Sequence, residues 1–192
     1  MEKTAVFQGY FRVDRYRLRH RLHDGGWSGE LVREMFERGH AVAVLPYDPI
    51  TDVVVLIEQF RLGALAGGLH PWQTEAVAGI IGPGEAVADV ARREAAEEAG
   101  LDILDLVPAL TFLNSSGAMS QTTATFIGRV DASGAGGVHG LDAEGEDILV
   151  KPMAFADAMD LLNAGGIPDA QTVICLQWLA LNRERIRAAW SA

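Results

Sequence analysis

The stretch GEAVADVARREAAEEAGL, residues 84–101, is the most informative part of the chain for its fold. Its pattern predicts a helix over residues 85–99, with Gly100 at the position of a left-handed C-terminal cap. On a helix that advances about 100° per residue, three of its carboxylates fall within a sector of about 100°. They are Glu94, Glu97 and Glu98. Like charges this close repel one another and weaken an isolated helix, so their placement needs a reason.

These carboxylates share their side of the helix with apolar residues. Val87 lies about 20° and Val90 about 40° from Glu94 around the helix axis, so this side must face the body of the protein. An acid carried inward has to be protonated, paired or bound to a metal ion. Arg92 points away and Arg93 lies to the side, so we expect neither to neutralise three acids. Two interpretations stay open: a solvated Glu-rich face, and a site for a hard cation such as Mg²⁺, which prefers oxygen ligands.

Outward from this helix, strand-like and helical segments are interspersed without regular βαβ alternation, which predicts an α+β fold with a mixed sheet. The predicted strands of the main body cover residues 41–47, 52–61, 73–79, 107–114, 121–130 and 148–153. A Gly-rich acidic loop, residues 132–147, precedes the last of them. Two closing helices are predicted over about 154–164 and 169–189, and Asp169 is the expected N-cap of the second.

The first 40 residues read as a separate β segment, and residues 41–192 as the main domain. VDRYRLRHRL, residues 13–22, alternates strictly between arginines and other side chains, which is typical of a half-buried strand. The arginine row fits a solvated strand face, a contact with phosphates or a contact with a partner subunit. ELVREMFER, residues 30–38, fits a strand or a short helix.

Composition narrows the class of protein. The 192 residues include 26 acidic and 16 basic side chains, for a net charge of −10, and 49% of them are hydrophobic. This indicates a folded globular protein and argues against a binder of duplex nucleic acid. The single Cys175 excludes an internal disulfide and fits a reducing compartment, so we expect a cytoplasmic location. No segment reads as a signal peptide or a membrane span, and we expect no membrane partner.

The predicted helix and the residues before it match a known pattern. Five residues separate Gly79 from Glu85, and seven separate Glu85 from Arg93, which opens REAAEEAGL. This arrangement resembles the Nudix box, GX5EX7REUXEEXGU with U apolar, with every position filled and the small Ala95 in one apolar slot. A match at seven fixed residues is far more specific than a short glycine motif.

The resemblance covers residues 7–190 and extends to the bacterial ADP-ribose pyrophosphatases of the Nudix superfamily. It is carried outside the box by FERGHAVAVLPYDP, VVLIEQFR, PWQTEAVAGII, VHGLDAEGEDI and VICLQWLALN. It implies an α/β/α sandwich with a mixed sheet, and a homodimer that exchanges the N-terminal β segment, residues 1–40. It also implies hydrolysis of ADP-ribose to AMP and ribose 5-phosphate with Mg²⁺, for which Mn²⁺ can substitute.

The resemblance assigns roles to individual residues. The positions that match the family's metal contacts are the main-chain carbonyl of Ala78 and the carboxylates of Glu94, Glu97 and Glu98. Glu144 matches the proposed general base and Glu146 its helper, while Glu85 matches the acid that braces Arg93. The predicted substrate contacts are Arg33, Arg61, Ser116, Gly117 and Gln121. Diphosphate hydrolysis needs these elements, because a polyanion must be neutralised and a water activated.

Two positions depart from the family pattern. Ser116 stands where the family usually has a proline that marks ADP-ribose enzymes, and Gln121 stands where an acid is usual. These departures leave open a pyrophosphatase for another nucleotide sugar, such as GDP-mannose. A non-catalytic nucleotide-sugar sensor is the alternative of a different class. In each case the expected partner is a small nucleotide sugar and not a nucleic acid.

Overall fold

The computed structural model describes residues 1–190; Ser191 and Ala192, at the end of the predicted main domain, lie outside the described residues. The chain divides into two compact units. The first comprises residues 1–40 together with 112–122, and the second comprises the rest. The first unit therefore contains the segment predicted to be separate and, in addition, a loop from the middle of the sequence.

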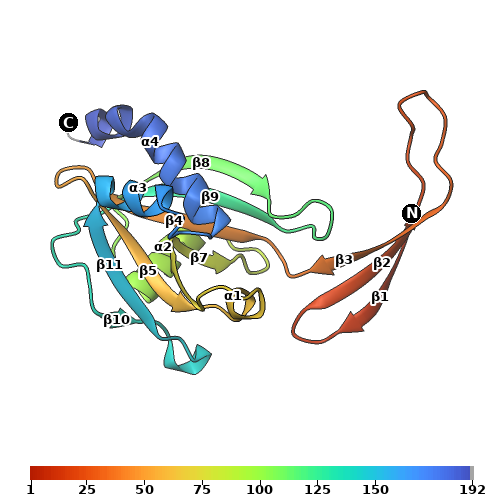
Figure 1. Ribbon diagram of the computed structural model, residues 1–192, viewed down its shortest axis with the longest axis horizontal. Coiled ribbons are helices and arrows are strands. Elements are labelled where there is room, and N and C mark those ends of the chain that lie inside the picture. Colours follow the sequence, from red (N-terminus) through yellow and green to blue (C-terminus); the bar gives the residue numbers. More distant parts are fainter. Residues whose placement is uncertain (191–192) are drawn as a thin grey trace. The chain divides into compact units, whose positions relative to one another are not determined.

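The first unit is built on a three-stranded antiparallel sheet in the order β1-β2-β3 (Figure 1). Its strands are β1 (Glu2–Gln8), β2 (Arg12–Leu18) and β3 (Leu31–Glu37). The alternation predicted over residues 13–22 is confirmed as far as Leu18, because Arg15 and Arg17 are exposed while Tyr16 and Leu18 are half-buried. Beyond it the prediction is wrong, because the strand ends there and His20 and Leu22 are exposed. The segment for which strand and helix were both open is a strand, β3. The sequence did not reveal β1, all of whose residues are exposed.

The second unit contains an eight-stranded mixed sheet, with β10-β11-β5-β4-β9-β8 as its main path. The strands are β4 (Ala41–Asp48), β5 (Val53–Phe60), β6 (Trp72–Glu75), β7 (Val77–Ile80), β8 (Asp105–Leu113), β9 (Thr122–Arg129), β10 (Val138–His139) and β11 (Ile148–Ala154). β4 and β9 run parallel, whereas β5 pairs antiparallel with both β4 and β11. The prediction of an α+β fold with a mixed sheet is confirmed.

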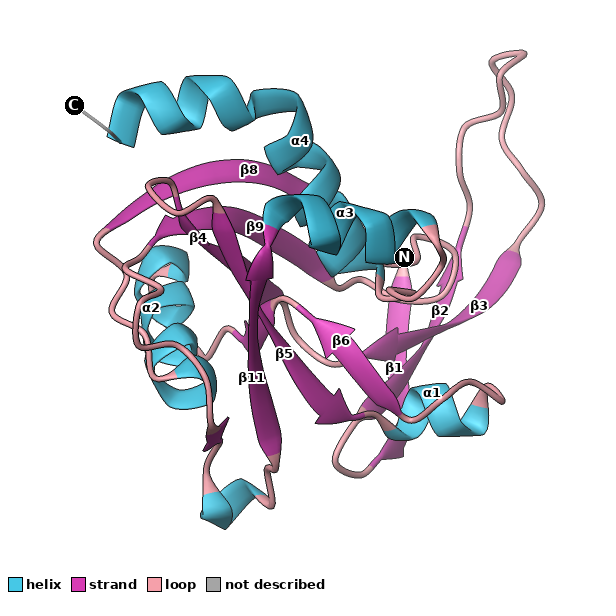
Figure 2. Ribbon diagram, turned by 60° about the vertical axis from the view of Figure 1, so that its left-hand side comes forward, coloured by secondary structure: helices cyan, strands magenta, loops and turns pink. Residues whose placement is uncertain are grey.

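Helices cover both faces of this sheet (Figure 2). Because side chains alternate along a strand, Val42 and Val44 of β4 pack into one core cluster with α2 (Val87–Ala99). Leu45 and Tyr47 of the same strand pack into the other with α3 (Phe155–Asn163) and α4 (Ala170–Trp190). This is the three-layer sandwich that the family resemblance implied.

The middle of the sheet is split, which positions the candidate site. β4 and β5 pair directly only at Tyr47–Val54 and Asp48–Val53. Beyond these residues they diverge, and β7 pairs with β4 while β6 pairs with β5. The prediction of one strand over 73–79 is therefore wrong: that segment forms two strands that pair with different neighbours. A short helix between β5 and β6, α1 (Leu62–Ala66), was not predicted either.

The predicted helix caps are confirmed. Gly100, with φ 63°, ends α2 in the left-handed conformation that glycine adopts at low cost. Asp169 caps α4, because its Oδ2 accepts the N–H of Thr172 at 2.9 Å. The predicted acidic loop contains β10 and a short 3-10 helix, η1 (Asp142–Glu144). Among residues 1–190, no helix is long and apolar enough to cross a membrane.

Candidate functional site

The three carboxylates of α2 lie on the side of the helix that faces the sheet. Glu98 is buried, with 4% of its surface exposed, and Glu94 and Glu97 are half-buried. Val90 and Ala91, from the same helix, belong to the core cluster. The expectation of an inward carboxylate face is confirmed, and the interpretation of a fully solvated Glu-rich face is wrong.

The strand β7 forms the wall opposite these acids. The main-chain N–H of Ala78 donates to Oε2 of Glu98 at 3.1 Å. A Cβ atom on Gly79 would overlap the side chain of Glu94, so glycine leaves room for this carboxylate in the position that it occupies. The glycine that opens the sequence motif therefore makes room beside β7 for the Glu94 side chain.

Arg93 contacts more acids than the sequence suggested. Its guanidinium lies 3.0 Å from Glu94, 2.9 Å from Glu97 and 3.7 Å from Glu85. Arg93 thus pairs with two of the three acids, which is more than its place at the side of the helix suggested. Arg92 points away and donates to the carbonyl of Ile103. Arg93 is still a single positive charge beside several carboxylates. Among residues 1–190, no cationic side chain lies within 4.0 Å of the Glu98 carboxylate.

Burial makes ionisation of these acids costly. It raises the pKa of Glu98 to about 8, and the negative charges of Glu94 and Glu146 add to this effect. The N–H of Ala78 and the charge of Arg61 act in the opposite direction. Burial also raises the pKa of Glu94, although Arg93 opposes the shift. A cation bound between these groups would relieve this cost.

Arg61 follows β5 directly and is held by a buried acid. Its Nε and Nη2 donate to one oxygen of Glu75 at 2.9 and 2.7 Å. Burial raises the pKa of Glu75, opposed by the charge of Arg61. Arg61 is among the predicted substrate contacts, whereas Glu75 was not predicted. The available signal was an acid inside an apolar strand, four residues before Gly79.

The acidic loop reaches α2 through its backbone. The N–H of Gly140 donates to the carbonyl of Glu97 at 3.3 Å. Oε2 of Glu146 accepts the N–H of Leu141 at 3.0 Å, and its charge acts on both Glu94 and Glu98. Glu144 lies on the exposed helix η1 and forms no hydrogen bond or ion pair through its side chain with residues 1–190. Of the two loop acids, Glu146 is therefore the one whose charge raises the pKa of Glu94 and Glu98.

The remaining predicted substrate residues belong to the first unit. Arg33 lies on β3 and donates to the carbonyl of Val32 at 2.8 Å. Ser116 and Gly117 are exposed in a turn. Gln121 is buried, with 2% of its surface exposed, and its Oε1 accepts from Asn114 at 2.6 Å. Its Nε2 has no hydrogen-bond partner within residues 1–190, so the side chain carries an unused donor.

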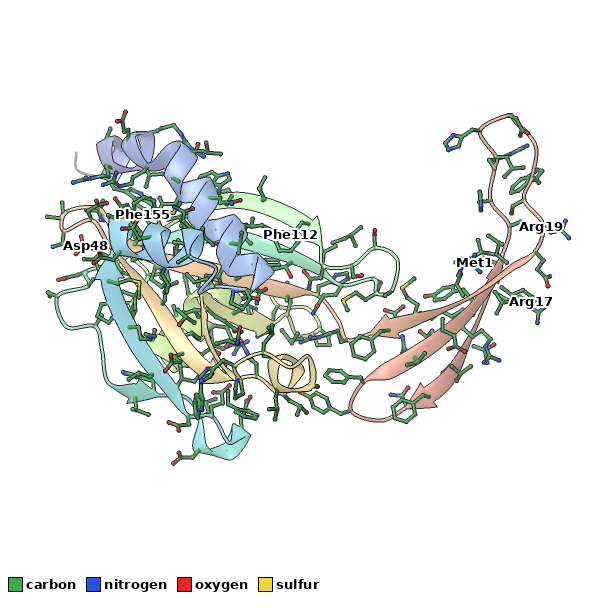
Figure 3. The ribbon with its side chains drawn as sticks, viewed as in Figure 1. Met1, Arg17, Arg19, Asp48, Phe112 and Phe155 are labelled. Atoms are coloured by element: carbon green, nitrogen blue, oxygen red, sulfur yellow. The ribbon has the colours of Figure 1, made fainter. Side chains whose placement is uncertain are left out.

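The predicted arginine row of β2 is paired within its own sheet. Arg15 lies 2.8 Å from Glu34, and Arg17, labelled in Figure 3, lies 2.6 Å from Glu30. Each pair is half-exposed, and pairs of this kind contribute little to stability. Half-exposed ion pairs between neighbouring side chains fit a solvated strand face.

The donor set around α2 fits a hard divalent cation. It consists of the carboxylates of Glu94, Glu97 and Glu98. Carboxylate oxygens are ligands that Mg²⁺ prefers, and Mg²⁺ keeps several waters when it binds protein. Among residues 1–190, no three acidic, histidine or cysteine side chains already converge closely enough to enclose a metal ion. Glu94 and Glu98 lie one helical turn apart on α2, so together with waters they suit an ion with few protein ligands.

Comparisons with known proteins identify the class to which this fold and these acids belong. The sequence model of the NUDIX domain matches residues 37–167. An ADP-ribose pyrophosphatase from Escherichia coli (strain K12) is 47% identical over 189 residues, which cover 98% of this chain and 90% of the relative. A GDP-mannose pyrophosphatase from Cronobacter sakazakii is 35% identical over 162 residues, which cover 80% of this chain and 82% of the relative. The chain belongs to the NUDIX family and is a Nudix hydrolase, as its sequence motif predicted.

A solved structure supports the fold independently. A crystal structure described as an ADP compounds hydrolase aligns with a TM-score of 0.70 at 20% identity, over 97% of both chains. The three-layer arrangement is therefore shared by proteins of very different sequence. Nudix pyrophosphatases depend on divalent metal ions in general, which agrees with the oxygen-rich donor set on α2.

Proposed function

We propose that the protein hydrolyses the diphosphate bond of ADP-ribose, giving AMP and ribose 5-phosphate, with Mg²⁺ as the metal and Mn²⁺ as a substitute. The observation that carries this proposal is the inward face of α2, which packs carboxylates against β7 with too few cations to neutralise them. The 47% identity to the ADP-ribose pyrophosphatase of Escherichia coli supports the choice of substrate.

The metal would be held by the α2 acids. We assign this role to Glu94, Glu97 and Glu98 and to the main-chain carbonyl of Ala78. A bound divalent cation supplies neutralisation of the diphosphate charge and polarises its oxygens. Arg93 now pairs with Glu94 and Glu97, and we expect these pairs to loosen when a cation arrives.

The hydrolysis adds one water across the diphosphate. The water oxygen forms a bond to one phosphorus, the bridging P–O bond breaks, and the proton of the water passes to a carboxylate. We assign Glu144 as this base and Glu146 as its helper. Because Glu146 already acts on the α2 acids and Glu144 is exposed, the loop must shift for Glu144 to reach the water.

Substrate contacts and assembly complete the proposal. We assign Arg33, Arg61, Ser116, Gly117 and Gln121 to binding of the nucleotide sugar. Arginines suit this role because a guanidinium grips phosphate oxygens with two parallel hydrogen bonds. We also propose a homodimer that exchanges the N-terminal β segment, and a cytoplasmic location, which the buried single Cys175 fits.

A turnover panel tests the function. With Mg²⁺ present, AMP release from ADP-ribose should be at least as efficient, in kcat/KM, as cleavage of GDP-mannose or any other nucleotide sugar. GDP-mannose is the second candidate, because Ser116 and Gln121 depart from the ADP-ribose pattern and a GDP-mannose pyrophosphatase is a 35% identical relative. Turnover of GDP-mannose with inert ADP-ribose would reverse the assignment. Absence of turnover on the whole panel would favour a sensor.

A further inference from the structure

The loop between β8 and β9 is bound to the N-terminal sheet. Residues 114–122, here called the substrate loop, fall within the first compact unit. The N–H of Phe36, on β3, donates to the carbonyl of Ala118 at 2.8 Å. Phe36 also forms a parallel bridge with Met119. The loop therefore contacts β3 through one backbone hydrogen bond and a single isolated bridge.

Glu37 joins this loop to the rest of the sheet through its two carboxylate oxygens. Oε1 accepts the hydroxyl of Tyr16 at 3.1 Å and lies 3.7 Å from Nζ of Lys3. Oε2 accepts the hydroxyl of Ser120, in the substrate loop. Only 14% of the Glu37 side chain is exposed, and a hydrogen bond to an ionised acceptor shielded from water is stronger than a neutral one.

Glu37 does not contact the turn of the loop, which contains Ser116 and Gly117. A side chain placed on Gly117 would meet no other atom within 4 Å, and Ser116 is exposed beside it. Glu37 and Phe36 hold the loop at Ser120, Ala118 and Met119, so the turn is fixed in place without being covered.

We propose that Glu37 is a positioning residue, which holds the substrate loop on the N-terminal sheet so that its turn is ready for the nucleotide sugar. This inference rests on the proposed function, in which Ser116 and Gly117 contact substrate. A loop that is ordered in advance costs less entropy when ligand binds, so Glu37 acts on KM and leaves kcat unchanged.

Steady-state kinetics test the effect on binding. Glu37→Ala and Ser120→Ala should each raise KM by about threefold to tenfold, the range of a single hydrogen bond, with kcat within about twofold of wild type. The double variant should be no worse than Glu37→Ala, because both changes remove the same bond. Glu34→Ala is the matched control: Glu34 lies on the same strand and pairs with Arg15, so KM should not change.

Hydrogen exchange of the ligand-free protein tests the loop itself. Amides of residues 114–122 should exchange faster in Glu37→Ala and in Ser120→Ala. Tyr16→Phe, which removes only the contact inside the sheet, should leave them unchanged. This second arm needs no substrate, so it decides whether the loop is held even if ADP-ribose is not the ligand.

Each outcome bears on the inference. Unchanged loop exchange in both variants overturns it, and so does a KM effect equal to that of Glu34→Ala or additive in the double variant. Faster exchange with an unchanged KM also overturns it, because the loop would then be held without serving substrate. A wild-type protein without turnover on nucleotide sugars would instead contradict the proposed function.

Discussion

Gly79 lies so close to Glu94 that any side chain at position 79 would overlap the carboxylate of Glu94. The strand residue and the helix residue are fifteen positions apart in sequence, and the absence of a side chain at Gly79 leaves room for the Glu94 carboxylate. The position of the acid at residue 94 thus requires a glycine at residue 79. This relationship can be tested directly by mutation.

Gly79→Ala should displace Glu94 and lower kcat/KM by at least about tenfold, through misplacement of a metal-binding acid. Turnover as a function of Mg²⁺ concentration measures the change, and the Mg²⁺ requirement should rise. Gly63→Ala in α1 is the control, because a side chain there meets open space and the backbone is helical. Equal activity of the two variants would contradict the explanation given for Gly79.

Removal of the buried charge of Glu98 should separate metal binding from folding. Mg²⁺ should raise the melting temperature of the wild type, because a ligand that binds only the folded state stabilises it. Glu98→Gln should lose most of this increase and most turnover, while the metal-free variant stays folded, since the amide can still accept from Ala78. A variant with a full Mg²⁺ response would exclude Glu98 as a ligand.

Glu144→Gln and Glu146→Gln distinguish the two loop acids. If Glu144 is the base, its variant should lose about a hundredfold or more in kcat and keep the Mg²⁺-induced rise in melting temperature. Glu146→Gln should have a smaller effect on kcat and a larger one on the metal response, because its charge acts on Glu94 and Glu98. The opposite order would move the base to Glu146.

Glu75 should matter through Arg61. Glu75→Gln keeps the shape of the side chain but removes the charge that holds the guanidinium. We expect KM to rise about tenfold, which corresponds to about 1.4 kcal/mol of lost binding, with a smaller change in kcat. Glu58→Gln is a suitable control, because Glu58 pairs with Lys151 and makes no contact with Arg61. An unchanged KM would show that Glu75 does not orient Arg61 for substrate.

Acid stability should depend on Asp52, at the end of the sheet where β4 and β5 meet. Burial opposes its ionisation, but hydrogen bonds from Arg183 at 2.7 Å and Tyr47 at 2.6 Å outweigh this and lower its pKa. Asp52 therefore contributes stability that is fully present above its unfolded pKa and is lost as pH falls through the folded value.

Asp52→Asn should cost about 1–3 kcal/mol of unfolding free energy at pH 7 and less near pH 3. Asparagine tolerates the positive φ of 59° at this position, so backbone strain does not confuse the result. Urea unfolding at the two pH values measures the difference. A cost that is the same at both would show that the charge of Asp52 is not what stabilises this corner.

The sequence predicted those features whose signals are local. Gly100 ends α2 and Asp169 caps α4 as expected, because caps depend on residues a few positions apart. The inward face of α2 followed from helical geometry alone. The family resemblance predicted the three-layer fold and the class of enzyme.

Features that depend on distant partners were not predicted. The break between β6 and β7 falls at Ala76, whose N–H donates to the hydroxyl of Thr172 in α4, almost a hundred residues away. Glu75 became significant only once strand pairing placed it against Arg61. The strand β1 was missed because all its side chains are exposed, so burial imposes no alternation on it.

The attachment of the substrate loop to β3 has a consequence for protein engineering and for evolution. Consider a chimaera in which only residues 1–40 are replaced by those of a relative. Its substrate loop would still have the sequence that fits the original β3, and Ser120 would face the relative's residue at position 37. The heritable module is discontinuous: it comprises the N-terminal sheet and residues 112–122 together. Recombination that respects this pairing should yield active chimaeras, whereas a single crossover after His40 should separate two segments adapted to each other.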